Sequence, residues 1–303
     1  MNHEDWKGVF PAITTPFDDD GNVDEGFLAE HIPWLIDHGC TGVVPLGSLG
    51  EANTLRFDEK VRVLEICQSV IEGRVPLVAG ISGLSTGECV ELAEAAADVG
   101  CDGLMVLPAY VHRGDEREVE AHFRAVLAAT ELPCMLYNNP IAYGVELTPD
   151  LVKRLTKRHE NVQALKDSGG DVRRLTEIRE TMGERLALFA GLDDMVMETA
   201  LMGGDGWVAG MVNALPGESV QLFELARAGQ VKEAWKLYQW FLPILRLDTV
   251  PKFVQLIKLV QAEVGMGAET VRPPRLPLEG QEREAALRLI RSRLSRSSEE
   301  LPA

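Results

Sequence analysis

Short apolar runs alternate with longer amphipathic segments along most of the chain. The runs are rich in Val, Ile and Leu and nearly continuous in apolar character, which is typical of parallel strands buried on both faces. The segments between them carry apolar residues at helical spacing, as at Val119, Phe123 and Val126, and therefore predict helices. The eight predicted strands are Gly8–Thr14, Gly42–Gly47, Val75–Ile81, Gly103–Pro108, Pro133–Asn138, Val162–Ser168, Leu186–Leu192 and Gly206–Met211.

The junctions between helices and strands favour a closed barrel. Glycine-rich steps that begin at Gly39, Gly100 and Gly203 each end a helix and lead into a strand, where glycine supplies the left-handed cap. An open doubly wound sheet would carry a glycine-rich phosphate turn after its first strand, and Thr14–Phe17 is no such turn. The pattern therefore predicts the α/β class and a (β/α)8 TIM barrel.

The strand pattern stops near residue 230, and only helical periods follow. We therefore expect residues 1–229 to form the barrel with the active site, and residues 230–303 to form a C-terminal helical appendix packed on it. The last residues, Ser295–Ala303, are expected to be frayed. The predicted helices of the appendix are Val231–Leu247, Val250–Val264 and Gln281–Leu294.

The charge of the chain excludes two classes of partner. Of the 303 residues, 47 are acidic and 30 are basic, so the formal net charge is -17. Such a chain repels phosphate backbones and anionic lipid, which argues against nucleic-acid and membrane partners. An anionic small molecule stays possible, because a local pocket can be positive on a negative protein.

The cysteines and the N-terminus indicate a cytoplasmic protein. The cysteine count is odd, no CxxC occurs, and most cysteines fall in apolar segments, so we expect buried free thiols in a reducing compartment. The N-terminus has no apolar signal core, and no apolar run has the length of a membrane span. The five cysteines are Cys40, Cys67, Cys89, Cys101 and Cys134.

Lys166 is the most informative candidate for chemistry. It ends a predicted buried strand, and functional residues of such barrels lie at the carboxyl ends of strands. Burial disfavours the ammonium form of a lysine and so favours a nucleophilic amine, which condenses with a ketone to an iminium. The alternative is a structural lysine paired with Asp167 or Asp171.

Hydroxyl groups at neighbouring strand ends strengthen this interpretation. Tyr137 is expected at the level of Lys166 on the adjacent strand, where a phenol can move the protons of iminium formation. A rim tyrosine bonded to backbone is the alternative. Ser48 and Tyr110 could extend a hydroxyl relay, and the glycine-bounded turn around Ser48 could hold a carboxylate.

Other motifs point to no further chemistry. The six histidines show no metal-ligand spacing, and no GxSxG or P-loop motif occurs. His112 follows the fourth strand and could line a site. Asp193 follows the seventh strand, and the simplest expectation is that it caps the next helix.

Four segments, in order, resemble motifs of the dihydrodipicolinate synthase/N-acetylneuraminate lyase family, and the resemblance covers essentially the whole chain. Gly8–Phe17 looks like the opening strand of that family. Gly47–Glu51 is similar to its G-[ST]-x-G-E carboxylate-binding motif, and Tyr137–Pro140 is similar to its Y-N-x-P motif. Leu165–Gly169 looks like its Schiff-base lysine strand.

The resemblance implies roles for the candidate residues. Lys166 would form the Schiff base with a 2-oxo acid, Tyr137 would be the general acid and base, and Ser48 would relay protons. Tyr110 matches a tyrosine that reaches across a dimer interface, which implies a homo-oligomer, usually a tetramer. No metal and no organic cofactor are implied. The substrate-binding residues would be Ser48, Leu49, Gly50, Asn138 and Val208.

Two departures from the family pattern bear on the substrate. Leu49 replaces a second threonine of the first motif, and Ala142 stands where an arginine binds the carboxylate of a second substrate. The pairing of the two motifs looks more like 1-pyrroline-4-hydroxy-2-carboxylate deaminases of hydroxyproline degradation. We therefore expect deamination of this cyclic imine to 2-oxoglutarate semialdehyde.

Several alternatives share the Schiff base. They are a dihydrodipicolinate synthase, a pyruvate-dependent aldolase that cleaves a 4-hydroxy-2-oxo acid, and a sugar-acid dehydratase. A barrel that binds a 2-oxo acid without turnover is a further alternative. Lys166 and Tyr137 argue against it, because a binding protein needs neither group.

Overall fold

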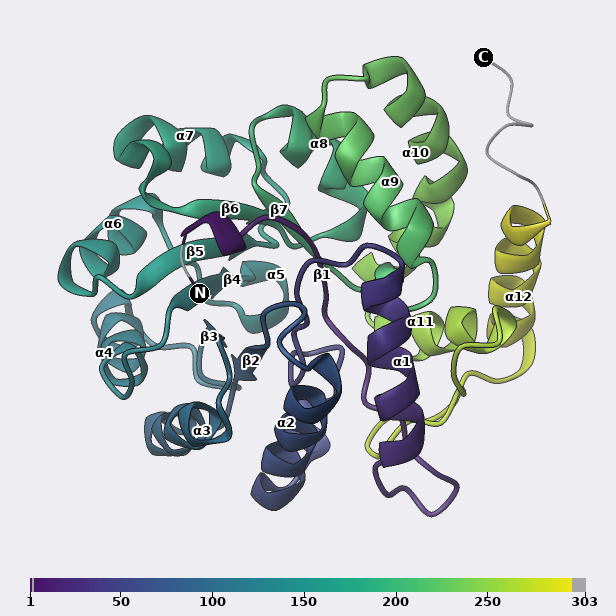
Figure 1. Cartoon of the computed structure of the whole chain (residues 1–303), viewed down its shortest axis with the longest axis horizontal. Helices are drawn as coiled ribbons and strands as arrows, with labels where there is room; N and C mark the ends of the chain where they lie inside the picture. Colours follow the sequence, from purple (N-terminus) through teal and green to yellow (C-terminus); the bar gives the residue numbers. More distant parts are fainter. Residues whose placement is uncertain (2, 296–303) are drawn as a thin grey trace.

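The structure is a computed structural model that describes residue 1 and residues 3–295. Seven parallel strands form one curled sheet in the order β1-β7-β6-β5-β4-β3-β2, and helices surround it (Figure 1). This architecture confirms the predicted α/β barrel. The predicted frayed tail, Ser295–Ala303, lies outside the described residues from position 296 onward. The strands are β1 (Gly8–Pro11), β2 (Val78–Ile81), β3 (Gly103–Val106), β4 (Cys134–Asn138), β5 (Val162–Asp167), β6 (Ala187–Ala190) and β7 (Gly206–Ala209).

The predicted strand at Gly42–Gly47 differs from the structure. Residues 43 and 44 make only isolated parallel bridges, to Leu77 and Ala12, and form no full ladder. These bridges lie between β1 and β2, so the segment closes the gap between the two ends of the sheet. Regular pairing ends there because Leu46 has a left-handed backbone, with φ of 62°.

The helices that follow the strands cover the outer face of the sheet (Figure 1). The glycines at positions 39, 100 and 203 follow α1, α3 and α8 with positive φ, which confirms the predicted junctions. The barrel helices are α1 (Glu25–Asp37), α2 (Phe57–Ile71), α3 (Thr86–Val99), α4 (Glu116–Leu127), α5 (Pro140–Tyr143), α6 (Pro149–Arg158), α7 (Arg173–Met182), α8 (Val196–Leu201) and α9 (Pro216–Arg227).

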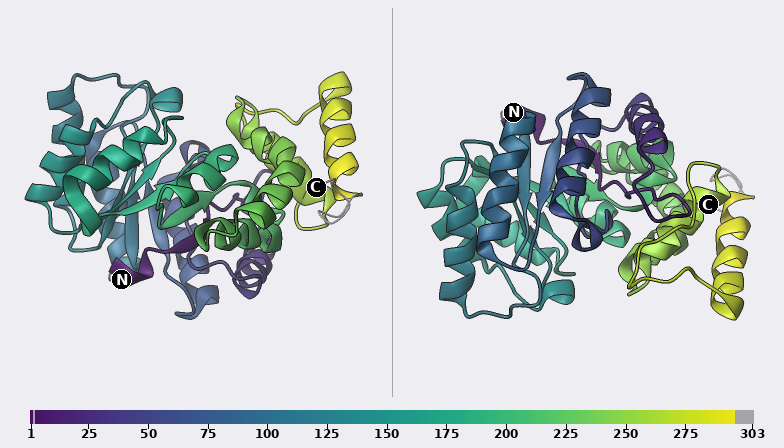
Figure 2. Two further views of the ribbon diagram at one scale, coloured as in Figure 1. Left: turned by 90° about the horizontal axis from the view of Figure 1, so that it is seen from above. Right: turned by 90° about the horizontal axis from the view of Figure 1, so that it is seen from below.

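The predicted C-terminal helices are present and lie at one side of the barrel (Figure 2). α10 packs on α9, and α12 packs on α10 and α11. None of the helices in the described residues combines the length and the apolar character needed to cross a membrane. The appended helices are α10 (Val231–Leu245), α11 (Phe253–Glu263) and α12 (Gly280–Leu294), with a 3-10 turn, η6 (Arg246–Thr249), between α10 and α11.

Aromatic side chains fill the barrel at the amino end of the strands. Trp6 and Phe10 are fully buried and both pack edge-on against Phe189, with ring centroids 6.2 and 5.3 Å away. The Trp6 indole donates a hydrogen bond to Gln163 at 3.1 Å, so its polar edge is satisfied. With this end closed, the carboxyl end of the barrel is left for a site. All five cysteines are buried and unpaired, as predicted.

A buried histidine links α1 to the loop after β7. Nε2 of His31 donates to the Asn213 carbonyl at 2.8 Å, and the ring stacks between Phe27 and Trp34. Burial lowers the pKa of His31 from 6.5 to about 4, because the imidazolium loses its hydration. The folded chain therefore keeps this imidazole neutral where the unfolded chain protonates it.

Replacing His31 tests this linkage through the pH dependence of stability. Between pH 6.5 and about 4 the unfolded state binds the proton more tightly, so the free energy of unfolding falls as the pH falls. The loss attributable to His31 is about 3 kcal/mol across this window. His31→Gln keeps a donor for Asn213, and we expect a flatter stability profile by urea denaturation. Parallel profiles for the two proteins would contradict this account.

Candidate active site

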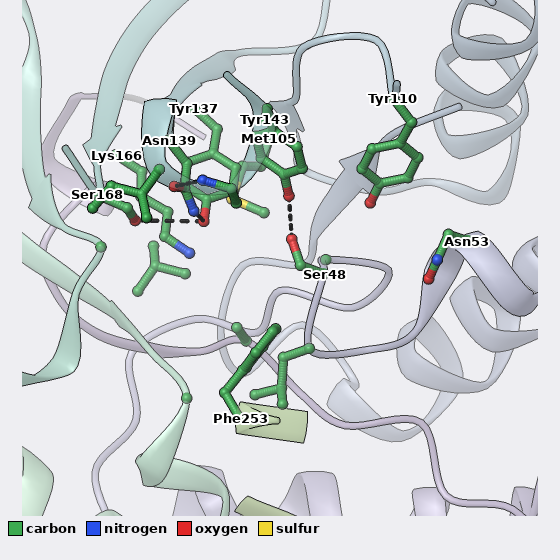
Figure 3. Close-up of a pocket in the computed structure, with 18 of the residues that line it drawn as sticks. Ser48, Asn53, Met105, Tyr110, Tyr137, Asn139, Tyr143, Lys166, Ser168 and Phe253 are labelled. Atoms are coloured by element: carbon green, nitrogen blue, oxygen red, sulfur yellow. Dashed lines mark hydrogen bonds between the residues drawn. The ribbon is translucent and has the colours of Figure 1, made fainter. Parts of the chain in front are cut away.

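The site is built around the register of two neighbouring strands. β4 and β5 run parallel, and their pairing places Tyr137 directly opposite Lys166. The two side chains are 5% and 6% exposed, respectively, and Nζ of Lys166 lies 4.3 Å from the centroid of the Tyr137 ring. An amine and a phenol are therefore held together at the carboxyl end of the barrel, as predicted (Figure 3).

Polar side chains fix the orientation of the phenol. The Tyr137 hydroxyl accepts a hydrogen bond from Nδ2 of Asn139 at 3.0 Å and one from Oγ of Ser168 at 3.4 Å. These bonds come from side chains, so Tyr137 is not a rim tyrosine tied to backbone. Its lone pairs are engaged by donors, which leaves its own proton free to be passed on.

The carboxylates near Lys166 in sequence have other partners. Asp167 points to the outer side of β5, where it pairs with Arg174 at 2.8 Å. Asp171 pairs with Arg173 at 2.6 Å. Among the described residues no ion pair holds the Lys166 amine, so the structural alternative of a paired lysine does not apply. A buried amine that is not held in a direct ion pair is suited to act as a nucleophile.

The loop at residues 47–51 faces this amine and can hold an anion. Among the described residues, no acceptor takes up the backbone N–H groups of Ser48 and Leu49. Two left-handed residues bound the loop, Leu46 with φ of 62° and Glu51 with φ of 54°. Successive free amides in such a turn form a concave binding site for a carboxylate.

A cluster of phenols connects this loop to the amine. Oγ of Ser48 shares a hydrogen bond with the Tyr143 hydroxyl, and the Tyr143 ring packs edge-on against Tyr137 with centroids 6.0 Å apart. The Tyr110 ring packs against the Tyr143 ring of the same chain, with centroids 5.6 Å apart. Burial raises the pKa of Tyr110 and raises that of Tyr143 well above its usual value. Both phenols therefore remain protonated donors at neutral pH.

Tyr143 was missed by the sequence argument, although it follows the Y-N-x-P motif closely. The available signal was its position, because α5 begins at Pro140 and ends three residues later at Tyr143. In the structure, Tyr143 contacts both ends of the expected relay, since it hydrogen bonds to Ser48 and packs against the Tyr137 ring.

A cavity of about 1050 Å³ joins the amine, the loop and the phenols. This size accommodates a small metabolite together with a second reactant. Among the described residues, no group of three histidine, cysteine, aspartate or glutamate side chains could hold a metal ion. The sequence-predicted residues that line the cavity are Ser48, Leu49, Tyr110, Tyr137, Lys166 and Val208.

Two sequence-predicted binding residues lie outside the cavity lining. Asn138 is fully buried on the outer side of β4, where Oδ1 accepts from the Leu147 amide at 2.9 Å. Its place follows from strand alternation, because Tyr137 already faces inward. Gly50 packs under the loop, where a Cβ would lie only 3.0 Å from the Ile13 carbonyl oxygen. Both residues shape the site from behind.

Two buried carboxyl groups near the cavity were not recognised from the sequence. Asp193 accepts hydrogen bonds from the Trp207 indole at 3.0 Å and the Met211 amide at 2.6 Å, so the expectation that it caps a helix is wrong. Asp248, from the C-terminal extension, lines the cavity beside Gly210. Burial and the charge of Asp193 raise the pKa of Asp248 well above its usual range.

A buried ion pair ties the anion-binding loop to the C-terminal helices. Nζ of Lys258 on α11 lies 2.7 Å from Oε1 of Glu51, and the two side chains are 2% and 0% exposed. The same ammonium donates to the carbonyls of Thr15 and Thr270. Arg272 donates its backbone N–H to Glu51 as well, so the carboxylate is satisfied on both oxygens.

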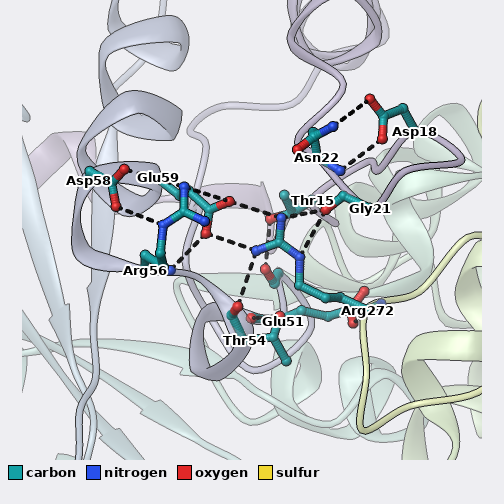
Figure 4. A network of polar contacts seen from close by, with 11 residues as sticks. Thr15, Asp18, Gly21, Asn22, Glu51, Thr54, Arg56, Asp58, Glu59 and Arg272 are labelled. Atoms are coloured by element: carbon teal, nitrogen blue, oxygen red, sulfur yellow. Dashed lines mark hydrogen bonds and ion pairs between the residues drawn. The ribbon is translucent and has the colours of Figure 1, made fainter.

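Arg272 extends this network to α2. Its guanidinium lies 2.8 Å from Glu59 and also donates to the carbonyls of Gly21 and Thr54 (Figure 4). Segments far apart in the chain therefore meet directly behind the loop that can hold an anion.

A barrel with an unpaired buried lysine under a phenol is the architecture of a Schiff-base lyase, and comparisons with known proteins agree. The pattern of the dihydrodipicolinate synthetase family matches residues 5–293. A 4-hydroxy-tetrahydrodipicolinate synthase from Methanothrix thermoacetophila is 35% identical over 291 residues, covering 96% of this chain and 97% of that protein. One from Agrobacterium fabrum is 33% identical over 282 residues, covering 93% and 96%.

Solved structures show the same similarity. A dihydrodipicolinate synthase from Acinetobacter baumannii complexed with pyruvate superposes with a TM-score of 0.90 at 30% identity, covering 95% of this chain and 98% of that one. One from Aquifex aeolicus gives a TM-score of 0.90 at 26% identity, covering 94% and 97%. The chain belongs to the dihydrodipicolinate synthetase family and is a lysine Schiff-base lyase.

The comparisons correct the expected substrate. Deamination of 1-pyrroline-4-hydroxy-2-carboxylate was predicted from Leu49 and Ala142, and this prediction is wrong. Relatives that match nearly the whole chain at 32–35% identity are 4-hydroxy-tetrahydrodipicolinate synthases. The departures at Leu49 and Ala142 were therefore a poorer guide to the substrate than the similarity of the whole chain.

The buried ion pair should dominate the stability of the loop. Glu51→Gln leaves the Lys258 ammonium buried without a counter-ion, and we expect a loss of about 3–5 kcal/mol in the free energy of unfolding. The double variant Glu51→Gln/Lys258→Met should lose less than the sum of the single variants, as measured by urea denaturation.

An exposed ion pair of the same length provides the control. Arg62 and Glu25 are also 2.7 Å apart, but their side chains are 52% and 47% exposed. Arg62→Ala should therefore change stability by only about 0–1 kcal/mol. Equal losses for Arg62→Ala and Glu51→Gln would show that burial of the Glu51–Lys258 pair has no special effect.

Proposed function

We propose that the chain condenses pyruvate with an amino aldehyde, as a 4-hydroxy-tetrahydrodipicolinate synthase, with Lys166 as the Schiff-base nucleophile. The observation that carries the proposal is the buried Lys166 amine beneath Tyr137, which no ion pair holds among the described residues and which faces a loop whose amides are free within the same residues. The activities of the similar proteins from Methanothrix and Agrobacterium support the same reaction.

The identity of the second reactant follows from carbon balance. 4-Hydroxy-tetrahydrodipicolinate is a cyclic imine with seven carbons and two carboxylates. Removal of the three carbons of pyruvate leaves a four-carbon aldehyde that carries an amine and a carboxylate, which is aspartate 4-semialdehyde. Both reactants are small carboxylates. The cationic side chains of the cavity suit them, although the chain as a whole carries a net charge of -17.

The first half of the reaction forms the nucleophile. The Lys166 amine attacks the ketone carbon of pyruvate while the amides of Ser48 and Leu49 hold the carboxylate. Tyr137 protonates the hydroxyl of the carbinolamine, water leaves, and an iminium remains. Loss of a methyl proton then gives an enamine, with the positive nitrogen acting as the electron sink. The Ser48–Tyr143 hydrogen bond offers a path for this proton traffic.

The second half forms the carbon–carbon bond and releases the enzyme. The enamine carbon attacks the aldehyde carbon, and the aldehyde oxygen takes up a proton to become the hydroxyl group. The amine of the second reactant then attacks the iminium carbon and displaces Lys166, which closes the ring as an imine. No oxidant, metal or other cofactor takes part in these steps.

Product analysis with defined substrates tests the proposal. We expect the protein to consume pyruvate and aspartate 4-semialdehyde together and to form the cyclic imine, detected by mass spectrometry. Lys166→Ala should abolish product formation. Release of pyruvate from a 4-hydroxy-2-oxo acid, without any condensation, would replace the proposal with an aldolase. Product formation by Lys166→Ala at the wild-type rate would refute the role of Lys166.

Tyr137→Phe separates proton transfer from packing. The ring and its contact with Lys166 stay, while the hydroxyl and its bonds to Asn139 and Ser168 are lost. We expect kcat to fall by about 10²–10⁴, the range for loss of general acid–base help, with the fold intact by circular dichroism. An unchanged kcat would remove Tyr137 from the mechanism.

We also propose that the chain assembles as a homotetramer. Leu84, Val111 and Ile141 are large, exposed apolar side chains that gather at the mouth of the cavity, near Tyr110. A second copy would cover this apolar rim. Light scattering should give four times the mass of the chain, and a monomeric mass would contradict the proposal.

A further inference from the structure

The second reactant needs a cation that the first does not use. The amides of Ser48 and Leu49 are assigned to the carboxylate of pyruvate, so the carboxylate of the aldehyde must be bound elsewhere in the cavity. The family resemblance implies an arginine at position 142, and this chain has Ala142 there. Ala142 lines the cavity but offers only a methyl group. The structure therefore has to supply the positive charge from another element.

The cavity offers few free cations. Lys60 lies 3.4 Å from Glu88, so its charge is already paired. Arg275 lies 3.5 Å from Glu51 in the network behind the loop. By contrast, within the part of the chain that the structure describes, no carboxylate forms an ion pair with Arg113. The cationic side chains that line the cavity are Lys60, Arg113, Lys166 and Arg275.

The Arg113 guanidinium lies beside the segment in which the arginine is missing. It packs over Gly144, the residue that ends α5, and a Cβ at this position would lie 2.7 Å from Nε of Arg113. Gly144 also has a positive φ of 67°, so glycine serves both the turn and the close approach. The positive charge that position 142 lacks is thus supplied beside Gly144 by Arg113, from the loop between β3 and α4.

The loop that carries Arg113 has a strained conformation. Val111 has φ of 68°, which is unfavourable for a β-branched residue, and its side chain is 90% exposed in the single chain. The loop is fixed at both ends, by the bond from the Tyr110 amide to the Gly83 carbonyl at 2.9 Å and by the cap of α4 at Asp115. Arg113 therefore lies on a loop whose two ends are held by hydrogen bonds.

We propose that Arg113 binds the carboxylate of the aldehyde reactant and thereby replaces the guanidinium that is missing at Ala142. The proposal rests on the condensation proposed above. A planar guanidinium can engage a carboxylate through two parallel hydrogen bonds, which would also orient the aldehyde carbon toward the enamine. Arg113 is in this role a specificity-determining residue for the second reactant and has no part in forming the Schiff base.

Steady-state kinetics with both reactants tests this role. Arg113→Ala should raise KM for aspartate 4-semialdehyde by about 10- to 100-fold, while KM for pyruvate stays unchanged. Arg113→Lys should have a KM for aspartate 4-semialdehyde between those of the wild type and Arg113→Ala, because an ammonium cannot form the paired hydrogen bonds. Arg117→Ala is the matched control, since Arg117 is exposed on the adjoining helix and does not line the cavity.

A rescue variant distinguishes substrate binding from a structural effect. Ala142→Arg in the Arg113→Ala background returns a guanidinium to the same rim and should restore a low KM for the semialdehyde. A rise in KM for pyruvate as well, without rescue, would mean that Arg113 only holds the loop and would overturn the proposal.

The two proposals fail in different ways. If the wild-type protein condenses the reactants and Arg113→Ala leaves KM for the semialdehyde unchanged, the assignment of Arg113 is wrong and the condensation stands. If the wild-type protein forms no cyclic imine, the proposed function itself is wrong.

Discussion

The parallel register of β4 and β5 is the constraint on which the chemistry depends. Strand pairing places Tyr137 opposite Lys166, and alternation sends Asp167 to the outer face, where Arg174 takes its charge. A shift of one residue would reverse every side chain, exposing the acid to the cavity and burying the amine among helices. The backbone therefore separates a lysine from its neighbouring carboxylate more reliably than any side-chain packing could.

The C-terminal helices take part in the site although they lie outside the barrel. α11 supplies Lys258, whose buried pair with Glu51 holds the end of the anion-binding loop in a left-handed conformation. Such a backbone costs about 1–3 kcal/mol for a residue other than glycine, so it persists only where the surroundings fix it. The same extension places Asp248 in the cavity wall. The appendix thus shapes the site from behind and from one side.

The sequence predicted the barrel because strands buried on both faces leave continuous apolar runs that periodicity detects. It failed at Gly42–Gly47, where the left-handed Leu46 ends the pairing despite an apolar pattern. Motifs located Lys166, Tyr137 and Ser48, but Asn138 was assigned to the cavity because the inward face of a strand depends on register. Asp248 lies in a segment without a motif, and its role depends entirely on a tertiary contact. The substrate was misjudged because the two departures at Leu49 and Ala142 were given more weight than the pattern of the whole chain, which matches 4-hydroxy-tetrahydrodipicolinate synthases.

The central claim is that Lys166 forms a Schiff base with a 2-oxo acid, and reductive trapping tests it most directly. The full chain is incubated with pyruvate, reduced with borohydride, digested and mapped by mass spectrometry, with Lys166→Ala as the control. The account predicts one stable adduct of pyruvate, located on Lys166 and absent from the variant. An adduct on another lysine, or none at all in an active preparation, would contradict it.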